Sequence, residues 1–388
     1  MKHRRAAREG DNLMTDVDRV LVVGGGIAGL TLATALHRRG FEVNLVERAE
    51  DWQAAGAGLS VQANGMRILR RLGLDQAVID AGCIFRRWVF ADQDGEALCE
   101  IDLDRVWGDV GPCVGIARSR LQQVLVKGAA AVPTRLATTV TSLDDDARQV
   151  SVGFTDGTQE TYDLVVGADG IRSVVRDLAF ARVDPTFAGQ IAWRSISPVA
   201  LPGSPSVQFW LGDGCFFGLC SIDEGHTYGF GYLIHDRHRD PVDGRLERLR
   251  HRFGGFGPTV RDYLARLETD EQVHCSTIEW VEQERWHAGR VVLIGDAAHA
   301  SSPMMGQGGA MAMEDAWVLA EELQGHGTLE QALTAYVERR APRVHWVQRQ
   351  SRAVADSFEL PPHLLHRALR DRGRAMFHDR YAPLVADP

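Results

Sequence analysis

The hydrophobic positions at the start of the chain change period twice. Residues 20–23 form a short apolar run typical of a buried strand, and Leu30–Arg39 has the 3.6-residue period of a buried helix. Gly40 ends that helix, and Val43–Val46 is a second apolar strand. This order predicts a strand–helix–strand unit at the start of the fold.

The turn between the first strand and the helix has the pattern Gly-x-Gly-x-x-Gly at Gly24, Gly26 and Gly29. Gly24 permits the tight turn, Gly26 lets a pyrophosphate approach the backbone, and Gly29 lets helix and strand pack closely. The helix N-terminus adds free N–H groups and partial positive charge. Glu47, after the second strand, can accept hydrogen bonds from ribose hydroxyls. The pattern predicts a dinucleotide site, with a purely structural turn as the alternative.

Two later apolar strands also end in a glycine-rich, acidic loop. Gly167-Ala168-Asp169-Gly170 follows the first of them, and Gly295-Asp296-Ala297-Ala298-His299 follows the second. The loop at residues 300–309 (ASSPMMGQGG) then opens a helix predicted over residues 310–324. A long helical pattern begins at Leu329, with Pro342 as an expected kink or boundary.

The middle of the chain alternates strands and turns, which predicts an antiparallel sheet. The strands fall at residues 189–196, 207–211, 215–221 and 227–234. In the last of them Tyr228, Phe230 and Tyr232 share one face, while Gly229 and Gly231 leave the other face nearly bare. Such an aromatic face either walls a pocket or packs against another layer.

The composition excludes several kinds of protein. With 388 residues, 45% hydrophobic and 24% charged, the chain is ordinary for a soluble globular protein. A net charge of −9 argues against a nucleic-acid partner, and no apolar run approaches the ~18–20 residues that span a membrane. Residues 1–17 start basic but lack an apolar core, so we expect a disordered leader rather than a secretory signal.

Six cysteines are scattered along the chain without a C-x-x-C pair or zinc spacing, so we expect no metal site. Cys215 and Cys220 have a C-x4-C spacing but fall in a predicted strand. Five positions along a strand put two side chains on opposite faces with Cα atoms ~16 Å apart, too far for a disulfide. We therefore expect packing thiols in a reducing, cytoplasmic compartment.

Three motifs together carry a family resemblance. They are GGGIAG at Gly24–Gly29, GADG at Gly167–Gly170, and GDAAH at Gly295–His299 followed by Gly-Gln-Gly-Gly. In this order the chain resembles the single-component flavoprotein monooxygenases of the para-hydroxybenzoate hydroxylase type. It looks most similar to members acting on urate, salicylate or 6-hydroxynicotinate. The resemblance covers residues 20–351.

The resemblance implies an α/β fold: a Rossmann-like FAD-binding domain with an inserted antiparallel-sheet substrate domain and C-terminal helices. The FAD-binding domain comprises residues 18–185 and 286–330, the substrate domain 186–285, and the helices 331–388. It further implies noncovalent FAD, NADH or NADPH as a transient reductant, and O2. A flavin C4a-hydroperoxide would then hydroxylate a small aromatic or heteroaromatic molecule.

The resemblance also assigns site residues. Asp296 holds a ribityl hydroxyl, and the loop from Pro303 passes the isoalloxazine, with N–H groups facing its N1–C2=O edge. Arg118 lies along the ribityl chain or pyrophosphate, Asp169 serves cofactor binding, and His299 stays structural. The predicted cofactor residues are Gly24, Gly26, Gly29, Glu47, Arg48, Ser60, Arg118, Val140, Asp169, Asp296, Pro303, Gly306, Gly308 and Gly309.

Tyr228 and Arg194 are the candidate catalytic residues. The resemblance places a tyrosine of the strand at residues 227–234 against the substrate, where its phenol can orient a ring hydroxyl or carbonyl. If the tyrosines instead pack in a core, the pocket wall falls to Trp193 and Arg194 or to Phe216 and Phe217.

Other functions share parts of this pattern. A flavin halogenase carries W-x-W-x-I-P, whereas no W-x-W occurs here. An epoxidase or Baeyer–Villiger oxygenase with the same motifs stays open, and product analysis would distinguish it. A non-catalytic flavin- or ligand-binding protein also stays open, because it would hold FAD without substrate-stimulated NAD(P)H oxidation. The oligomeric state is left open as well.

Overall fold

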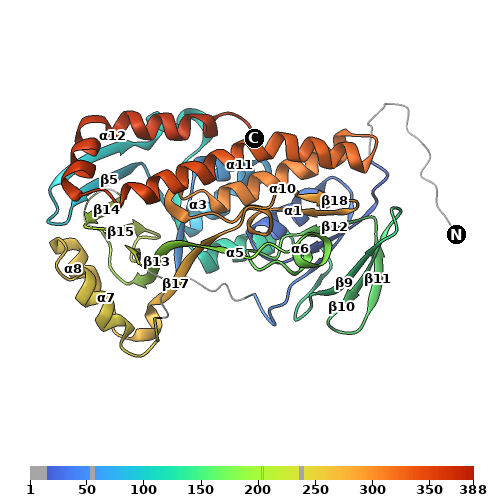
Figure 1. The fold of residues 1–388 in the computed structure, drawn as a ribbon, viewed down its shortest axis with the longest axis horizontal. Coiled ribbons are helices and arrows are strands. Elements are labelled where there is room, and N and C mark those ends of the chain that lie inside the picture. The colour runs from blue at the N-terminus through green and yellow to red at the C-terminus, as the bar shows by residue number, and fades with distance from the viewer. Residues whose placement is uncertain (1–14, 53–56, 202, 204, 236–239) are drawn as a thin grey trace.

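A computed structural model describes residues 15–52, 57–201, 203, 205–235 and 240–388 of the chain. Two large sheets lie toward opposite ends of the long axis (Figure 1). The long helices α10 (Gly308–Gly325) and α11 (Leu329–Ser357) run between them. The structure is thus mixed α/β, as the sequence predicts.

The first large sheet has the strand order β18-β19-β12-β1-β2-β8. Neighbouring strands from β19 to β8 pair in parallel, and only the short β18 is antiparallel. This is the 3-2-1-4-5 order of a dinucleotide-binding sheet. The strands are β1 (Arg19–Val23), β2 (Glu42–Val46), β8 (Thr134–Arg135), β12 (Leu164–Gly167), β18 (His287–Ala288) and β19 (Val291–Leu293).

The central strands of this sheet are apolar along their whole length, because helices cover both faces of a parallel sheet. Each residue of Val20–Val23 and of Leu164–Gly167 is buried. Helix α1 (Ile27–Arg38) connects β1 to β2 and packs on α10. The predicted Rossmann-like unit is therefore present.

The second large sheet has the order β17-β13-β16-β15-β14-β5-β6. Its strands are β5 (Arg87–Asp92), β6 (Ala97–Asp102), β13 (Thr186–Ser197), β14 (Val207–Gly212), β15 (Cys215–Ser221), β16 (Thr227–Ile234) and β17 (His274–Trp280). Residues 87–102, which the sequence-based division assigns to the FAD-binding part, thus contribute two strands. Strand β5 pairs with β14 in parallel, whereas the sequence predicts an antiparallel sheet.

Two small antiparallel sheets complete the strands. One joins β9 (Val140–Asp145), β10 (Val150–Phe154) and β11 (Gln159–Tyr162), and the last two form an antiparallel hairpin. The other joins β3 (Gly58–Val61), β7 (Cys113–Ala117) and β4 (Cys83–Phe85). Strand β3 also contacts β13 and β16, so the second small sheet adjoins the second large one.

The remaining helices cover the sheets. The chain forms α2 (Ala63–Arg71), α3 (Asp75–Ala81), α4 (Leu103–Trp107), α5 (Arg118–Gly128), α6 (Val174–Ala179), α7 (Arg245–Phe253), α8 (Pro258–Ala265), α9 (Asp296–His299) and α12 (Pro362–Val385). Single 3-10 turns lie at Gly108–Val110, Asp270–Gln272 and Pro303–Met305. None of the helices in the described ranges is long and apolar enough to cross a membrane.

Two expectations about the chain's periphery change. Of the kink or boundary expected at Pro342, the boundary is wrong, because α11 continues through this residue. Arg340 and Arg343 anchor the turns on both sides to acidic residues of α10. Residues 1–14 of the expected leader lie outside the described residues. Residues 15–17, however, pack on the fold: Thr15 Oγ1 donates to the Leu323 carbonyl at 3.0 Å, and Val17 is buried.

The second large sheet has two different faces, as the sequence of β16 predicts. On one face, a Cβ placed on Gly229 would lie 2.5 Å from the Tyr263 ring, and one on Gly231 would lie 2.7 Å from the Phe253 ring. Helices α7 and α8 therefore pack directly on the bare backbone. On the other face, the rings of Tyr228 and Phe230 lie 5.1 Å apart.

Gly229→Ala tests this close packing. The added methyl group would overlap the Tyr263 ring, so we expect a loss of about 1–3 kcal/mol of unfolding free energy. Thermal denaturation measures the effect. Gly225→Ala is the matched control, because the nearest atom to a Cβ there is 4.0 Å away and its φ is negative. Equal stability of the two variants would contradict the packing described.

Candidate functional site

Four of the predicted cofactor residues follow parallel strands of the first large sheet. Gly24 follows β1, Glu47 follows β2, Asp169 lies two residues after β12, and Asp296 lies three residues after β19. Because the carboxyl ends of parallel strands meet at one edge of a sheet, these residues gather there. The fold thus brings together residues that are up to 272 positions apart in sequence.

The glycine turn has the geometry that the motif requires. Gly24 has a φ of +109°, and a Cβ on it would lie 2.5 Å from the Ala168 carbonyl oxygen. A Cβ on Gly29 would lie 1.9 Å from the Gly24 carbonyl oxygen, so the helix can pack this closely on the turn only if residue 29 has no side chain. At Gly26, by contrast, no described atom lies within 4 Å of a Cβ position. The open side of this turn is where a phosphate group can approach.

Two helix N-termini converge on this space. Helix α1 begins at Ile27 and α10 at Gly308, and neither first turn receives a hydrogen bond from a capping side chain in the described part of the chain. A Cβ on Gly309 would lie 3.5 Å from the Ile27 side chain, so the two ends are neighbours. Gly308 is open on its outer side. Free N–H groups and two aligned helix dipoles favour a negatively charged ligand here.

Glu47 closes one side of the turn. Its carboxylate accepts hydrogen bonds from the Gly25 N–H at 2.6 Å and from the Ala49 N–H at 2.9 Å. A Cβ on Gly25 would lie 2.5 Å from the Trp52 ring, which covers this part of the turn. Neighbouring Arg48 is exposed.

Asp169 has a structural task in this arrangement. Its carboxylate accepts hydrogen bonds from Ser173 Oγ at 2.5 Å and from the Val174 N–H at 2.7 Å, so it caps the start of α6. Burial raises the pKa of Asp169 despite these bonds. The side chain is therefore engaged by its own helix, and a cofactor contact by Asp169 stays a prediction.

Asp296 is the exposed residue of an otherwise buried turn. Gly295, Ala297 and Ala298 on either side of it are buried. A Cβ on Gly295 would lie 3.0 Å from Ala28 of α1, so Asp296 belongs to the same space as the glycine turn. Its carboxylate is available for a ligand hydroxyl group.

The remaining predicted cofactor residues separate into two sets. Ser60 on β3 meets the glycine loop, because a Cβ on Gly306 would lie 3.6 Å from Ser60 Oγ. Pro303 is exposed at the start of that loop, and Arg118 is exposed at the first turn of α5. Val140 differs, since its side chain is buried at the start of β9, where it serves the core.

Strand β3 connects the glycine loop to the aromatic face of the second sheet. A Cβ on Gly58 would lie 2.5 Å from Cγ of Tyr228, so the tyrosine ring rests on the β3 backbone. Gly58 and Ser60 lie two positions apart and share a face of the strand. Tyr228 and the loop at Gly306 thus meet the same side of one short strand.

Arg194 lies on the aromatic face as well, because it pairs with Phe230 across β13 and β16. It donates hydrogen bonds to Ser276 Oγ at 2.7 Å and to the Tyr232 hydroxyl at 3.4 Å. Burial lowers the pKa of Arg194, but the phenol oxygens of Tyr232 and Tyr228 outweigh it, so the net shift is upward. Arg194 is a permanent cation beside two phenols.

The aromatic residues named as alternative pocket walls lie on different faces of the second large sheet. Trp193 and Phe217 both pack on Phe253 of α7, on the side away from Tyr228. Phe216 stacks on Tyr232, with ring centroids 4.8 Å apart. Of the aromatic alternatives, Phe216 is therefore the one that shares the face with the tyrosines.

A cluster of buried polar residues behind the site was missed from the sequence. Glu314, Asp315 and Arg340 are each 0% exposed, and Asn64 and His299 complete the cluster. Burial raises the pKa of Asp315, but His299 and Arg340 outweigh it and bring this pKa to about 2. Two adjacent acids in the apolar run at residues 310–320 were the available signal, since buried charges require partners.

The geometry fits a dinucleotide with an attached ring system. An open glycine turn and two uncapped helix N-termini suit a pyrophosphate and a ring that carries negative charge. Exposed Asp296 and the carboxylate of Glu47 suit sugar hydroxyls. FAD has each of these groups, so fold and site together define a flavin-dinucleotide-binding protein.

Comparison with known proteins identifies the family. Residues 17–351 match the profile of the FAD-binding domain family, and the chain belongs to this family. The match includes both large sheets, the glycine turn and the loop before α10. FAD is therefore the cofactor that the site accommodates.

Relatives of known activity are similar over nearly the whole chain. Aurachin C monooxygenase/isomerase of Stigmatella aurantiaca is 35% identical over 330 residues, covering 84% of this chain and 86% of that protein. The 3-amino-4-hydroxybenzoate 2-monooxygenase PtmB3 of Streptomyces platensis is 35% identical over 383 residues, covering 91% of each chain. With such relatives, the chain is a flavoprotein monooxygenase of the aromatic hydroxylase type.

A solved structure shows the same architecture. HpxO of Klebsiella pneumoniae, in a complex with FAD and uric acid, superposes with a TM-score of 0.88 at 25% identity. The match covers 98% of this chain and 100% of that one. The arrangement of the two sheets is thus that of an FAD enzyme with a small heteroaromatic ligand.

Gly26→Val tests the open side of the glycine turn. The valine side chain would enter the space that a pyrophosphate needs, so we expect FAD binding at least about tenfold weaker, a change of about 1.4 kcal/mol. Titration of the FAD-free protein with FAD measures it. Gly325→Val at the end of α10 makes the same change in open space and should bind FAD normally. Wild-type affinity in Gly26→Val would contradict the site.

Proposed function

We propose that this protein hydroxylates a small aromatic or heteroaromatic molecule, using noncovalently bound FAD, O2 and NADH or NADPH. The substrate lies between the aromatic face of the second large sheet and the flavin, and Tyr228 and Arg194 contact it. The single observation that supports this placement is the contact of Tyr228 with Gly58 of β3, the strand whose Ser60 adjoins the glycine loop.

The chemistry divides between the cofactor and the chain. When bound, FAD supplies the reduction of O2 and the delivery of one oxygen atom to the substrate ring. The chain binds and orients both molecules and keeps water from the reacting atoms. Aromatic rings around Tyr228 serve the last task, because Phe216, Phe230 and Tyr232 cover this face with apolar surface.

Arg194 and Tyr228 have complementary parts in orienting the substrate. A permanent guanidinium cation attracts an anionic oxygen, such as a phenolate or carboxylate on the ring. The Tyr228 side chain is 8% exposed, and burial raises the pKa of its phenol, which therefore stays protonated and can donate a hydrogen bond. A substrate that combines an aromatic ring with an anionic oxygen matches this pair.

The proposal extends to the roles of the two parts of the chain. The first large sheet and α10 form the FAD side, and the second large sheet with β3 forms the substrate side. The reductant binds transiently to this single chain. The cysteines are free thiols, a state that a reducing compartment maintains, and the proposal places the reaction in the cytoplasm.

The direct test is a screen of aromatic and heteroaromatic acids and phenols with the purified, FAD-loaded protein. NAD(P)H oxidation and hydrogen peroxide are recorded together, and products are identified. We expect a substrate to accelerate NAD(P)H oxidation and to yield a ring-hydroxylated product. If turnover required a separate flavin reductase, the single-component assignment would be wrong. An epoxide or a ring-expanded product would contradict hydroxylation.

Tyr228→Phe tests the orienting phenol. Loss of one oriented hydrogen bond should cost about 1–3 kcal/mol of transition-state stabilisation, measured as a lower kcat/KM. More peroxide should be released per NAD(P)H oxidised. FAD binding and folding should stay unchanged, because the ring and its contact with Gly58 are retained. Coupled turnover, measured as product formed per NAD(P)H, reports the effect.

Tyr162→Phe provides the control for that substitution. Tyr162 is also a buried tyrosine, but it lies on β11 and its hydroxyl donates to Glu160 Oε2 at 3.1 Å. Its coupling should equal that of the wild type. If Tyr228→Phe also kept full coupling and turnover, the phenol would have no part in the site.

A further inference from the structure

Two adjacent carboxylates are buried in the middle of α10. Glu314 and Asp315 have 0% exposed side chains, and burying a charge costs several kcal/mol unless it is paired. Arg340 of α11, itself fully buried, bridges them: its Nη1 donates to Glu314 at 2.7 Å and its Nε to Asp315 at 2.8 Å. The remaining oxygen atoms of the two acids are bonded to other parts of the chain.

Asp315 holds the turn that carries Asp296. Its Oδ2 accepts hydrogen bonds from the Gly295 N–H at 2.9 Å and from His299 Nε2 at 2.5 Å. Gly295 immediately precedes Asp296, and His299 ends the same short helix. The carboxylate of Asp315 therefore fixes both ends of the turn that presents Asp296.

Glu314 holds the glycine loop through a second residue. Its Oε1 accepts a hydrogen bond from Asn64 Nδ2 at 2.9 Å. The same Nδ2 donates to Gln307 Oε1 at 2.9 Å, and Gln307 Nε2 donates to Asn64 Oδ1 at 3.3 Å. Gln307 is 1% exposed, so its side chain turns inward, whereas the next residue, Gly308, is exposed.

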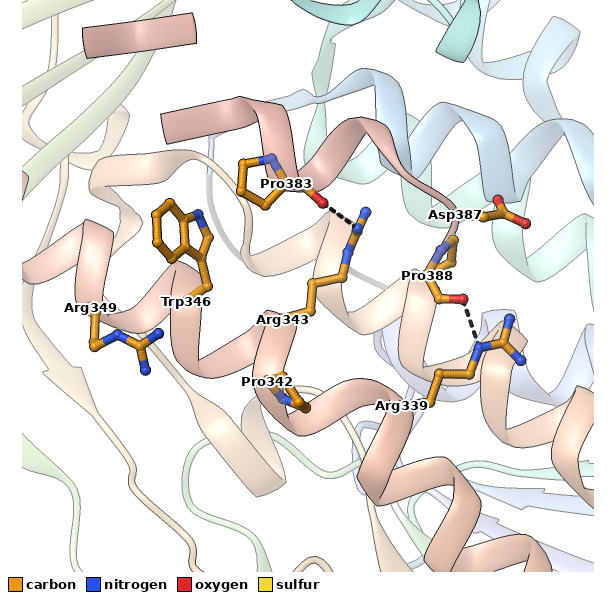
Figure 2. Close-up of a pocket in the computed structure, with 8 residues that line it drawn as sticks. All are labelled: Arg339, Pro342, Arg343, Trp346, Arg349, Pro383, Asp387 and Pro388. Atoms are coloured by element: carbon orange, nitrogen blue, oxygen red, sulfur yellow. Dashed lines mark hydrogen bonds between the residues drawn. The ribbon is translucent and has the colours of Figure 1, made fainter. Parts of the chain in front are cut away.

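Arg343 connects the same carboxylate to the end of the chain. Its guanidinium donates twice to Glu314, at 2.8 and 2.7 Å, and its Nη1 donates to the Pro383 carbonyl at 2.8 Å (Figure 2). Arg339, one turn earlier, donates to the Pro388 carbonyl (Figure 2). Its ion pairs are with Glu321 and Glu322 rather than with Glu314. Only one of these two neighbouring arginines therefore joins the buried cluster.

From these contacts we infer that Asn64, Gln307 and Glu314 form a positioning relay for the flavin. In this relay Glu314 holds Asn64 in place, and Asn64 in turn holds Gln307. The position of Gln307 then sets the distance of the loop N–H groups from the flavin ring. The inference rests on the proposed placement of the cofactor at this loop. It assigns Asn64 and Glu314 an effect on the flavin although both residues are fully buried.

The relay should affect the midpoint potential of the flavin, which a change in fold stability alone would not alter. N–H groups and the α10 N-terminus that face the N1–C2=O edge stabilise the reduced flavin, which carries negative charge there, more than the oxidised one. A loosened loop would lose part of this preference. The flavin would become harder to reduce, and its midpoint potential would become more negative.

Asn64→Leu is the primary variant, because leucine has a similar volume and makes no hydrogen bonds. We expect the bound flavin to lose about tenfold of its preference for the reduced state, which is about 30 mV for a two-electron couple. FAD affinity of the apoprotein should fall in the same variant. Dye-equilibrated reductive titration and FAD titration measure the two quantities.

Two controls separate positioning from stability. Tyr263→Phe removes buried hydrogen bonds to Ser195 on the far side of the second sheet, so it should lower the Tm but leave the potential unchanged. Arg339→Gln removes an arginine next to the relay and should also leave the potential unchanged. Gln307→Met, which cuts the relay but keeps the buried charges paired, replaces Asn64→Leu if the latter does not fold.

The outcomes are distinct. A negative shift in Asn64→Leu or Gln307→Met, with unchanged potentials in both controls, supports the relay. A lower Tm with wild-type potential and FAD affinity overturns it and leaves Asn64 a purely structural residue. Failure of the wild-type protein to bind FAD would instead overturn the proposed function, and the relay with it.

Discussion

The parallel pairing of β1 with β2 and β12 is the constraint on which the site depends. In-register pairing along these strands ends Val23, Val46 and Gly167 at one edge. The turns that follow therefore open on the same side, and each brings one polar or glycine position to it. A shift of this register would move the glycine turn away from Glu47 and Asp296 together, so pairing and cofactor binding are one property of the sheet.

The second requirement is that the substrate face meets this edge, and a short strand provides the junction. Strand β3 has backbone in contact with Tyr228 and a serine whose hydroxyl faces Gly306 of the glycine loop. Glycine at position 58 is necessary, because a side chain there would overlap the Tyr228 ring. On the opposite face of the second sheet, Gly229 and Gly231 admit α7 and α8 closely, which holds the aromatic face in place from behind.

The sequence predicted the elements whose pattern is local. The glycine turn, the strands around Asp169 and Asp296, and the two faces of β16 all follow from spacing along a single segment. The contributions of β5 and β6 to the second sheet did not, because pairing between segments over 100 residues apart leaves no periodic signal. The role of Asp169 as a helix cap and the packing of Val140 also required the fold, since a motif does not show where a side chain points.

The buried cluster around Glu314 and Arg340 shows the same limit more sharply. Two adjacent acids in an apolar run signal that partners are needed, but only the packing of α2, α10 and α11 shows which residues those partners are. Once they are assembled, arginines offset the cost of burying the two carboxylates, and the carboxylates also reach both cofactor turns, Asp315 directly and Glu314 through Asn64. Stability and cofactor geometry therefore share the same residues, which is why variants of this cluster need readouts of both.

The central claim, that this chain uses FAD to place one atom of O2 on an aromatic ring, is tested most directly by isotope labelling. The FAD-loaded protein is supplied with NAD(P)H, a substrate found by screening and 18O2, and the product is analysed by mass spectrometry. The account predicts one 18O atom in the ring-hydroxylated product. Product oxygen derived from water, or consumption of 18O2 entirely as hydrogen peroxide with every accepted ligand, would contradict it.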